Sequence, residues 1–304
     1  MVIIIFYMSV GLPLCPSTRQ DDLLFCSKMS KVPAEIQLLI LQELDGQEDV
    51  LCECALVCKL WHELCLPVLF RKLVINIEDL QTRNTLLANS PHIHPHIRKI
   101  TLQSSAFPVH VHPREEHMIG SLLLGLPRLD ELLCTSILLT AILPVLPQLS
   151  ITRLHLTRDI DPPCTILPIL KAVAGTLRSL TLEEFVFFDF EEELATENSV
   201  GPIIMTALEE LAIVDCDNLP STSDLVRMPN LKIVHYGAGW AALGDSIPSS
   251  LNTLVVAGAV IPVNFEPLNV DNVCILWWEG DRHDLFGAVK QAPLVWRAGE
   301  VGPA

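Results

Sequence analysis

The residues best suited to chemistry in this chain are histidines, because imidazole nitrogens gathered at high density can bind zinc or copper. Six of the ten histidines lie within 26 residues: His92, His94, His96, His110, His112 and His117. Prolines separate them, and no HExxH-type spacing supplies a catalytic carboxylate. We therefore expect histidines of loops and strand surfaces, with no metal and no cofactor. A metal-dependent enzyme remains the alternative.

Two further motifs are weaker candidates. Gly237-Ala238-Gly239 follows an apolar stretch and weakly resembles a nucleotide loop, but the third glycine, Gly244, lies at the wrong spacing. Glu191-Glu192-Glu193 belongs to an acidic stretch over 183–197, which we expect to be a solvated insertion loop that could also attract a basic partner. Since neither a G-x-S-x-G elbow nor a P-loop occurs, the sequence favours a non-catalytic protein.

The composition bounds the fold and the partners. The chain has 304 residues, half of them apolar, so it can bury a real core and is not disordered throughout. Asp and Glu outnumber Lys and Arg by 36 to 20, which gives a formal net charge of −16. Nucleic acid is therefore not expected as a partner, because a phosphate backbone requires a basic surface. Nor is a membrane expected as a partner.

The ten cysteines are spaced like buried, reduced thiols. Four of them, Cys52, Cys54, Cys58 and Cys65, fall in one helical segment, and the paired C-x2-C units of a zinc knuckle are missing. We expect an intracellular protein of the cytoplasm or nucleus.

The first 30 residues are a separate question. Val2–Cys15 is apolar but shorter than the roughly 20 residues that span a bilayer, and no basic residue precedes it. Met29 stands directly before the first well-formed motif. We predict an N-terminal extension over 1–30, disordered or an artefact of the gene model; a signal or anchor and a structured arm are the alternatives.

Residues 32–75 predict three short helices. Pro33 opens the first, and Glu35 complements the helix dipole in its first turn. One face of this helix is apolar, with Ile36, Leu39, Ile40 and Leu44. A second helix starts near Glu48 and a third near Lys59, which carries Trp61. So small a unit has surplus apolar surface, which should mark a partner interface.

The same segment resembles an F-box. The resemblance rests on Val32-Pro33-x-Glu35-Ile36, then Ile40 and Leu44, then Leu56-Val57-Cys58-Lys59-x-Trp61, then Leu69-Phe70, with Val32 where the family more often has Leu. It implies docking onto the Skp adaptor and through it onto a cullin scaffold. The implied interface comprises Pro33, Ile36, Ile40, Leu44, Leu51, Val57 and Trp61. The alternative is a generic helical cap in which Trp61 is simply core.

From residue 70 onward, an apolar-x-x-apolar-x-apolar motif recurs. Its predicted first positions are Phe70, Ile97, Leu129, Ile151, Leu177, Leu208, Leu231, Leu251 and Val273. The mean spacing of about 25 residues lies within the range of leucine-rich repeats. The chain as a whole thus resembles a fungal-type F-box protein with degenerate leucine-rich repeats. We expect an α/β fold, in which a three-helix F-box precedes a solenoid with a parallel strand ribbon and helical or irregular return limbs.

In such a solenoid, the first, fourth and sixth motif positions point into a stacked core, and the residues between them form an exposed ribbon. Helical return limbs are expected at 113–126, 136–147 and 165–175. We predict a target-binding ribbon that includes Arg153, His155, Thr181, Glu183, Ile233, His235, Val255 and Trp277. Alternation places one of Trp277 and Trp278 in the core; alternatively, the tail over 282–304 caps this end.

These observations lead to one functional hypothesis. We expect an F-box over 31–75, a solenoid over 76–281 and a cap or tail over 282–304. The protein would be a non-catalytic substrate adaptor of a Skp-cullin-F-box ubiquitin ligase that binds an unknown protein substrate. The alternative is a leucine-rich-repeat binding module that acts outside any ligase.

Overall fold

The computed structural model describes residues 32–104, 112–157, 166–185, 203–214, 216, 226–237, 251–257 and 272–276. The following lie outside the described residues: the predicted extension over 1–30, the acidic stretch from 186 to 197, Gly239, Gly244, Trp277, Trp278 and the tail over 282–304. Among the helices of the described part, none has the length and apolar character needed to cross a bilayer.

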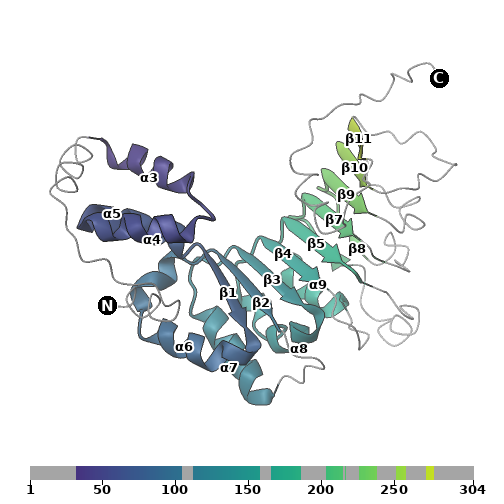
Figure 1. Ribbon diagram of the computed structural model, residues 1–304. Coiled ribbons are helices and arrows are strands. Elements are labelled where there is room, and N and C mark those ends of the chain that lie inside the picture. The colour runs from purple at the N-terminus through teal and green to yellow at the C-terminus, as the bar shows by residue number, and fades with distance from the viewer. Residues whose placement is uncertain are drawn as a thin grey trace.

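Three helices form a head at the N-terminal end of the described chain (Figure 1): α3 (Ala34–Gln42), α4 (Glu48–Val57) and α5 (Lys59–Leu69). The Pro33 carbonyl accepts hydrogen bonds from the amides of Ile36 and Gln37, both at 3.1 Å, so Pro33 caps α3 from just outside the helix. Gly46 lies in the turn before α4 with φ of +90°, a conformation that favours glycine. The three predicted helices are confirmed.

Within the described residues, nine parallel strands follow in a single sheet, and their order in the sheet is their order in the chain. The strands are β1 (Lys72–Asn76), β2 (Lys99–Gln103), β3 (Glu131–Thr135), β4 (Arg153–Thr157), β5 (Ser179–Glu183), β7 (Glu210–Val214), β9 (Ile233–Gly237), β10 (Thr253–Ala257) and β11 (Asn272–Leu276). Figure 1 shows them as a curved array that begins beside the head. This is an α/β fold with a parallel sheet, consistent with a repeat solenoid.

The strands begin in register because each repeat makes the same backbone hydrogen bonds. The Arg98 carbonyl accepts from the amides of Asp130 and Glu131 at 2.8 and 3.0 Å. The same pattern occurs at the residue before six other strands, with carbonyls of Arg71, Asp130, Thr152, Arg178, Glu209 and Lys232 as acceptors. The residues before the strands therefore form one continuous edge of the sheet, here called the strand-start edge.

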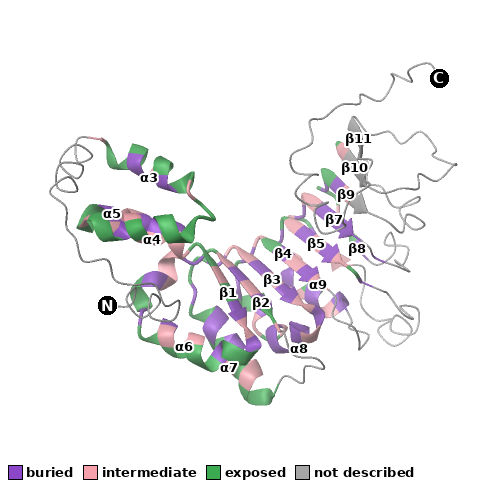
Figure 2. Cartoon of the chain, viewed as in Figure 1, coloured by how far each residue is buried: buried purple, intermediate pink, exposed green. Residues whose placement is uncertain are grey.

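The core of the sheet lies where the motif predicts it. In the third repeat, Leu129, Leu132 and Cys134 are buried, and the same three positions are buried in the repeats that begin at Ile97, Ile151, Leu177 and Leu208. These residues belong to one hydrophobic cluster that also takes in the helices of the return limbs. Figure 2 shows the alternation of buried and less buried residues along the strands.

The predicted start of the last repeat is wrong. Val273 pairs with Leu254, which is the fourth position of its own repeat, and Ile275 pairs with Val256, the sixth. The motif therefore starts three residues earlier, at position 270. Both alignments satisfy the apolar pattern in the sequence, and only strand pairing decides between them.

The return limbs are mostly short helices along one side of the sheet (Figure 1). The predicted limbs at 113–126 and 165–175 are confirmed as α7 (Pro113–Leu124) and α9 (Leu167–Val173). The limb at 136–147 is instead broken into the 3-10 turns η3 (Ser136–Leu138) and η4 (Leu146–Gln148) around α8 (Leu139–Ile142). Prolines 144 and 147 explain the interruption, because each removes a helical N–H.

Other limbs were not predicted. The first return limb holds η1 (Ile77–Asp79), α6 (Leu80–Ala88) and η2 (Pro91–His96). Helix α6 buries only Leu80 and Leu87, so its sequence shows a weak apolar pattern. In the C-terminal half, β6 (Ile203–Ile204) pairs with β8 (Val226–Arg227) in a separate two-stranded parallel sheet.

Candidate protein-binding surfaces

The head has its own small core, separate from that of the sheet. Its buried members are Leu41, Leu51, Ala55, Trp61, Cys65 and Val68, contributed by all three helices. Leu38, Leu44 and Leu64 are partly buried against them. Because the six buried residues already fill the contact between three helices, the remaining apolar side chains of the head point elsewhere.

Val50 on α4 is one exposed apolar residue of the head. Six others are together called the apolar head surface: Ile36, Leu39, Ile40, Leu56, Val57 and Leu60. Ile36, Leu39 and Ile40 on α3 are 47, 56 and 45% exposed, and Leu56 at the end of α4 is 64% exposed. Figure 2 shows exposed residues along much of α3. Large aliphatic side chains at this density on so small a unit are typical of an interface that a partner covers.

The predicted adaptor-interface residues differ in burial, so only some of them are free to contact a partner without rearrangement of the head. Pro33, Ile36, Ile40 and Val57 are exposed, as an interface requires. Leu51 and Trp61 are 1 and 7% exposed and belong to the head core, and Leu44 is half-buried against the same core. The sequence pattern could not separate the two groups, because apolar residues of a small helical unit serve both its core and its surface.

The head is fixed to the first strand of the sheet. The chain passes from α5 into β1 through Arg71, whose amide donates to the Val68 carbonyl at 3.3 Å. Lys72 Nζ in β1 donates to Asp45 Oδ2 at 3.0 Å, and Asp45 lies in the turn between α3 and α4. These contacts hold the head at one end of the strand-start edge.

Comparison with known families identifies the head. Residues 29–76 match the family model described as F-box-like. No curated protein matches the chain. The F-box-like domain covers the three helices and β1, and the rest of the sheet lies beyond the matched residues.

The predicted ribbon residues do lie on neighbouring strands. His155 and Thr181 are paired in register, and His155 Nε2 lies 2.9 Å from Glu183 Oε2. Two repeats further on, in β7 and β9, His235 Nε2 lies 3.1 Å from Glu210 Oε1, and Ile233 is exposed. Arg153 Nη1 lies 3.6 Å from Glu131 Oε2. The ribbon is thus a polar surface with two histidine–carboxylate pairs.

Two members of the predicted ribbon are less well placed. Val255 lies in β10 in register with His235, but its side chain is not described. Trp277 lies outside the described residues.

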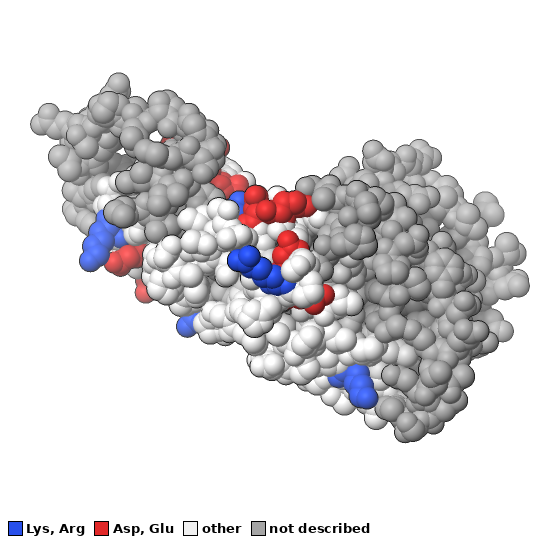
Figure 3. Space-filling view, turned by 90° about the horizontal axis from the view of Figure 1, so that it is seen from below, with Lys and Arg blue, Asp and Glu red and all other residues white. Residues whose placement is uncertain are grey.

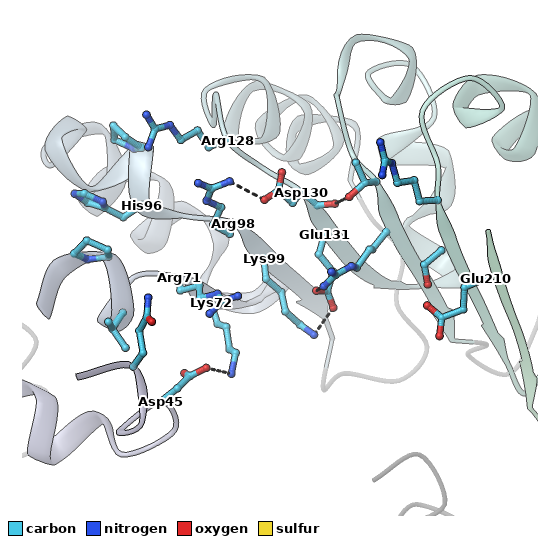
Figure 4. Close-up of a pocket in the computed structure, with 18 of the residues that line it drawn as sticks. Asp45, Arg71, Lys72, His96, Arg98, Lys99, Arg128, Asp130, Glu131 and Glu210 are labelled. Atoms are coloured by element: carbon cyan, nitrogen blue, oxygen red, sulfur yellow. Dashed lines mark hydrogen bonds and ion pairs between the residues drawn. The ribbon is translucent and has the colours of Figure 1, made fainter. Parts of the chain in front are cut away.

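A groove along the strand-start edge is a further surface, which the sequence analysis missed. It has a volume of about 1110 Å³ and extends from Leu38 and Pro67 of the F-box-like domain to Ile233 of β9. Figure 4 shows its lining near the head, with ion pairs from Lys72 to Asp45, Arg98 to Asp130 and Lys99 to Glu131. In the sequence, a pair of polar residues stands directly before and at the start of each groove-lining strand except β9, where the apolar Ile233 follows Lys232.

Among the six clustered histidines, His94 and His112 make contacts that support the local backbone structure. His94 Nε2 lies 3.0 Å from the Leu87 carbonyl, and His112 caps α7, with its Nδ1 accepting from the Arg114 amide and its amide donating to Glu115. Burial, together with the charges of Arg128 and His92, lowers the pKa of His96. His110 lies outside the described residues, and within the described part no three His, Cys, Asp or Glu side chains gather closely enough to hold a metal ion.

The cysteines of the F-box-like domain are not paired with one another. Cys65 is fully buried, and burial, with the neighbouring thiols of Cys54, Cys52 and Cys58, raises its pKa to about 12. Burial also raises the pKa values of Cys52 and Cys54. Thiols with raised pKa values are poor nucleophiles at neutral pH.

Proposed function

We propose that this chain is the substrate-recognition subunit of a Skp-cullin-F-box ubiquitin ligase. The observation that carries the proposal is the apolar head surface within the residues that match the F-box-like family. The chain would contribute no catalytic group: it would dock a Skp adaptor through the head and hold a protein target on the sheet, so that the target reaches a high effective concentration at the ligase. Such a complex would act in the cytoplasm or nucleus.

The sheet would serve as a degenerate leucine-rich-repeat solenoid. The in-register parallel strands, the buried first, fourth and sixth positions and the repeated backbone bonds at the strand-start edge support this assignment. Cys216 occupies the position at which leucine-rich repeats carry Asn or Cys, and its thiol donates to the carbonyls of Val214 and Leu182 at 3.3 and 3.5 Å. It thereby links two neighbouring repeats.

The expected contribution of the apolar head surface can be estimated. Full burial of an aliphatic side chain stabilises a complex by about 1.5–3 kcal/mol. Ile36, Leu39 and Ile40 are each about half exposed, so covering them should contribute about 1 kcal/mol each, or roughly 100-fold in affinity together. A buried carboxylate at these sites would add a desolvation cost.

The test is direct binding of the full chain to a purified Skp adaptor by calorimetry. The double variant Ile36→Asp/Ile40→Asp should lose at least 100-fold in affinity while its melting temperature stays unchanged. The matched control is Val74→Asp/Leu124→Asp, which places two carboxylates at exposed aliphatic sites outside the head, 50 and 46% exposed. If wild type does not bind the adaptor, or both double variants bind as wild type does, the proposal is wrong.

A further inference from the structure

The groove along the strand-start edge concentrates positive charge in an acidic protein. The chain as a whole has a formal charge of −16 and 20 Lys and Arg residues. Eight of these line the groove, against five carboxylates, so the groove has a formal balance of +3. The eight are Arg71, Lys72, Arg98, Lys99, Arg128, Arg153, Arg178 and Lys232. By contrast, Figure 3 shows charged side chains only in small, separate groups on the face seen from below.

Part of this positive charge has no ion-pair partner among the residues that the structure describes. Five of the eight cations are in ion pairs: Lys72, Arg98, Lys99, Arg153 and Lys232. Arg71, Arg128 and Arg178 are exposed and form no ion pair with any described residue. Three guanidinium groups, each able to hold a carboxylate by two parallel hydrogen bonds, are thus available to a ligand.

The dimensions of the groove favour an extended ligand. Its lining residues come from the starts of seven neighbouring strands, β1 to β9. Adjacent strands lie about 4.8 Å apart, so six steps between strands span about 29 Å. An extended peptide rises about 3.3 Å per residue and would cover this length with about nine residues.

Both ends of the groove also offer apolar contacts. Leu38, Pro67 and Pro95 lie at the end formed by the head, and Ile233 lies at the opposite end. A peptide with carboxylates in its middle and an aliphatic residue near one end would therefore complement the cations and one of the two apolar ends.

We propose that this groove binds an extended acidic segment, about nine residues long, of the client protein. That the bound segment belongs to a client protein rests on the proposed function, whereas the charge and length of the segment rest on the groove alone. The carboxylates of Asp130, Glu131, Glu209 and Glu210 interrupt the row of cations, which disfavours the evenly charged backbone of a nucleic acid. The concave shape disfavours a flat membrane surface, which an interfacial binder meets with a convex or planar face.

The experiment uses the full chain and a fluorescein-labelled nonapeptide with five Glu residues and one terminal Leu, followed by fluorescence anisotropy at low salt. The comparison peptide has Gln in place of every Glu. Wild type should bind the Glu peptide at least tenfold more tightly than the Gln peptide, and the preference should fall as salt rises.

Matched variants locate the site. The groove variant Arg71→Ala/Arg128→Ala/Arg178→Ala should weaken binding of the Glu peptide at least tenfold. The control variant Arg114→Ala/Lys171→Ala/Arg227→Ala removes the same charge at exposed sites outside the groove and should change binding less than twofold. Equal losses in both variants would mean non-specific attraction and would overturn the proposal, as would equal binding of the two peptides.

Two further arms exclude the other ligand classes and separate this proposal from the previous one. Tighter binding of a nine-nucleotide single-stranded DNA, or of vesicles rich in phosphatidylserine, would also overturn it. Both triple variants should still bind the Skp adaptor, since neither alters the apolar head surface. If wild type binds the Glu peptide through the groove but not the adaptor, the ligase function fails and the acidic-segment site stands.

Discussion

Replacing Trp61 with Ala should unfold the head rather than remove a contact with a partner. Trp61 is 7% exposed and is one of the six buried apolar residues that make up the described head core. Truncating a buried Trp to Ala costs about 3–5 kcal/mol. A unit of about 40 residues has a total stability of roughly 2–6 kcal/mol. The loss is therefore comparable with the whole stability of the head.

Hydrogen exchange followed by mass spectrometry measures this effect segment by segment. In Trp61→Ala, amides over 34–69 should exchange as in an unfolded chain, while the strands from β2 onward keep their protection, because their core is a separate cluster. The matched control is Leu60→Ala, since Leu60 is the adjacent residue and is 40% exposed. It should leave the protection of the head unchanged.

The result that would refute this reasoning is a Trp61→Ala protein with a fully protected head that no longer binds the Skp adaptor. Trp61 would then contact the partner directly, as the sequence analysis expected, and the division between head core and apolar head surface would be wrong.

Three further predictions concern the sheet, a buried thiol of the head and a histidine of the first return limb. Leu154→Ala should lower the free energy of unfolding of the sheet by about 2–5 kcal/mol in urea titrations, whereas Arg153→Ala, next to it but exposed, should change it by less than about 0.5 kcal/mol; similar effects would contradict the assignment of the buried face. Because the pKa of Cys65 is about 12, only about one Cys65 side chain in ten thousand is a thiolate at pH 8. Iodoacetamide should therefore modify Cys65 only after urea unfolds the head. Rapid modification in the native protein would contradict the burial of this thiol. Burial and then Arg128 lower the pKa of His96, so folding favours its neutral form. The stability that this gives is present above the unfolded pKa of 6.5 and is lost as the pH falls through the lowered pKa of the folded protein. His96→Gln should therefore reduce the drop in melting temperature between pH 7 and pH 5, and an unchanged drop would contradict this.

The sequence was sufficient to predict the three helices of the head and the parallel array of strands. Helix caps and apolar spacing are local signals, and a motif that recurs about every 25 residues specifies a stacked core even where single matches are weak. The same local signals failed at Val273, where two alignments of the apolar pattern were possible and pairing with Leu254 decided between them.

The functional surfaces were harder to predict. Ile40 and Trp61 both fit an apolar helix face, yet one is exposed and the other belongs to the head core, because core and surface separate only when three helices pack together. The groove was not predicted, because Arg71, Arg128 and Arg178 come from different repeats and the polar residues at the strand starts meet only when those starts align at one edge.

Hydrogen exchange of the full chain with and without a purified Skp adaptor tests the central claim most directly. We expect new protection over α3 and at the junction of α4 and α5, in peptides that contain Ile36–Ile40 and Leu56–Leu60, and no change in β2 to β9. Protection confined to the strands, or no change anywhere at saturating adaptor, would contradict the claim that the apolar head surface is the docking face.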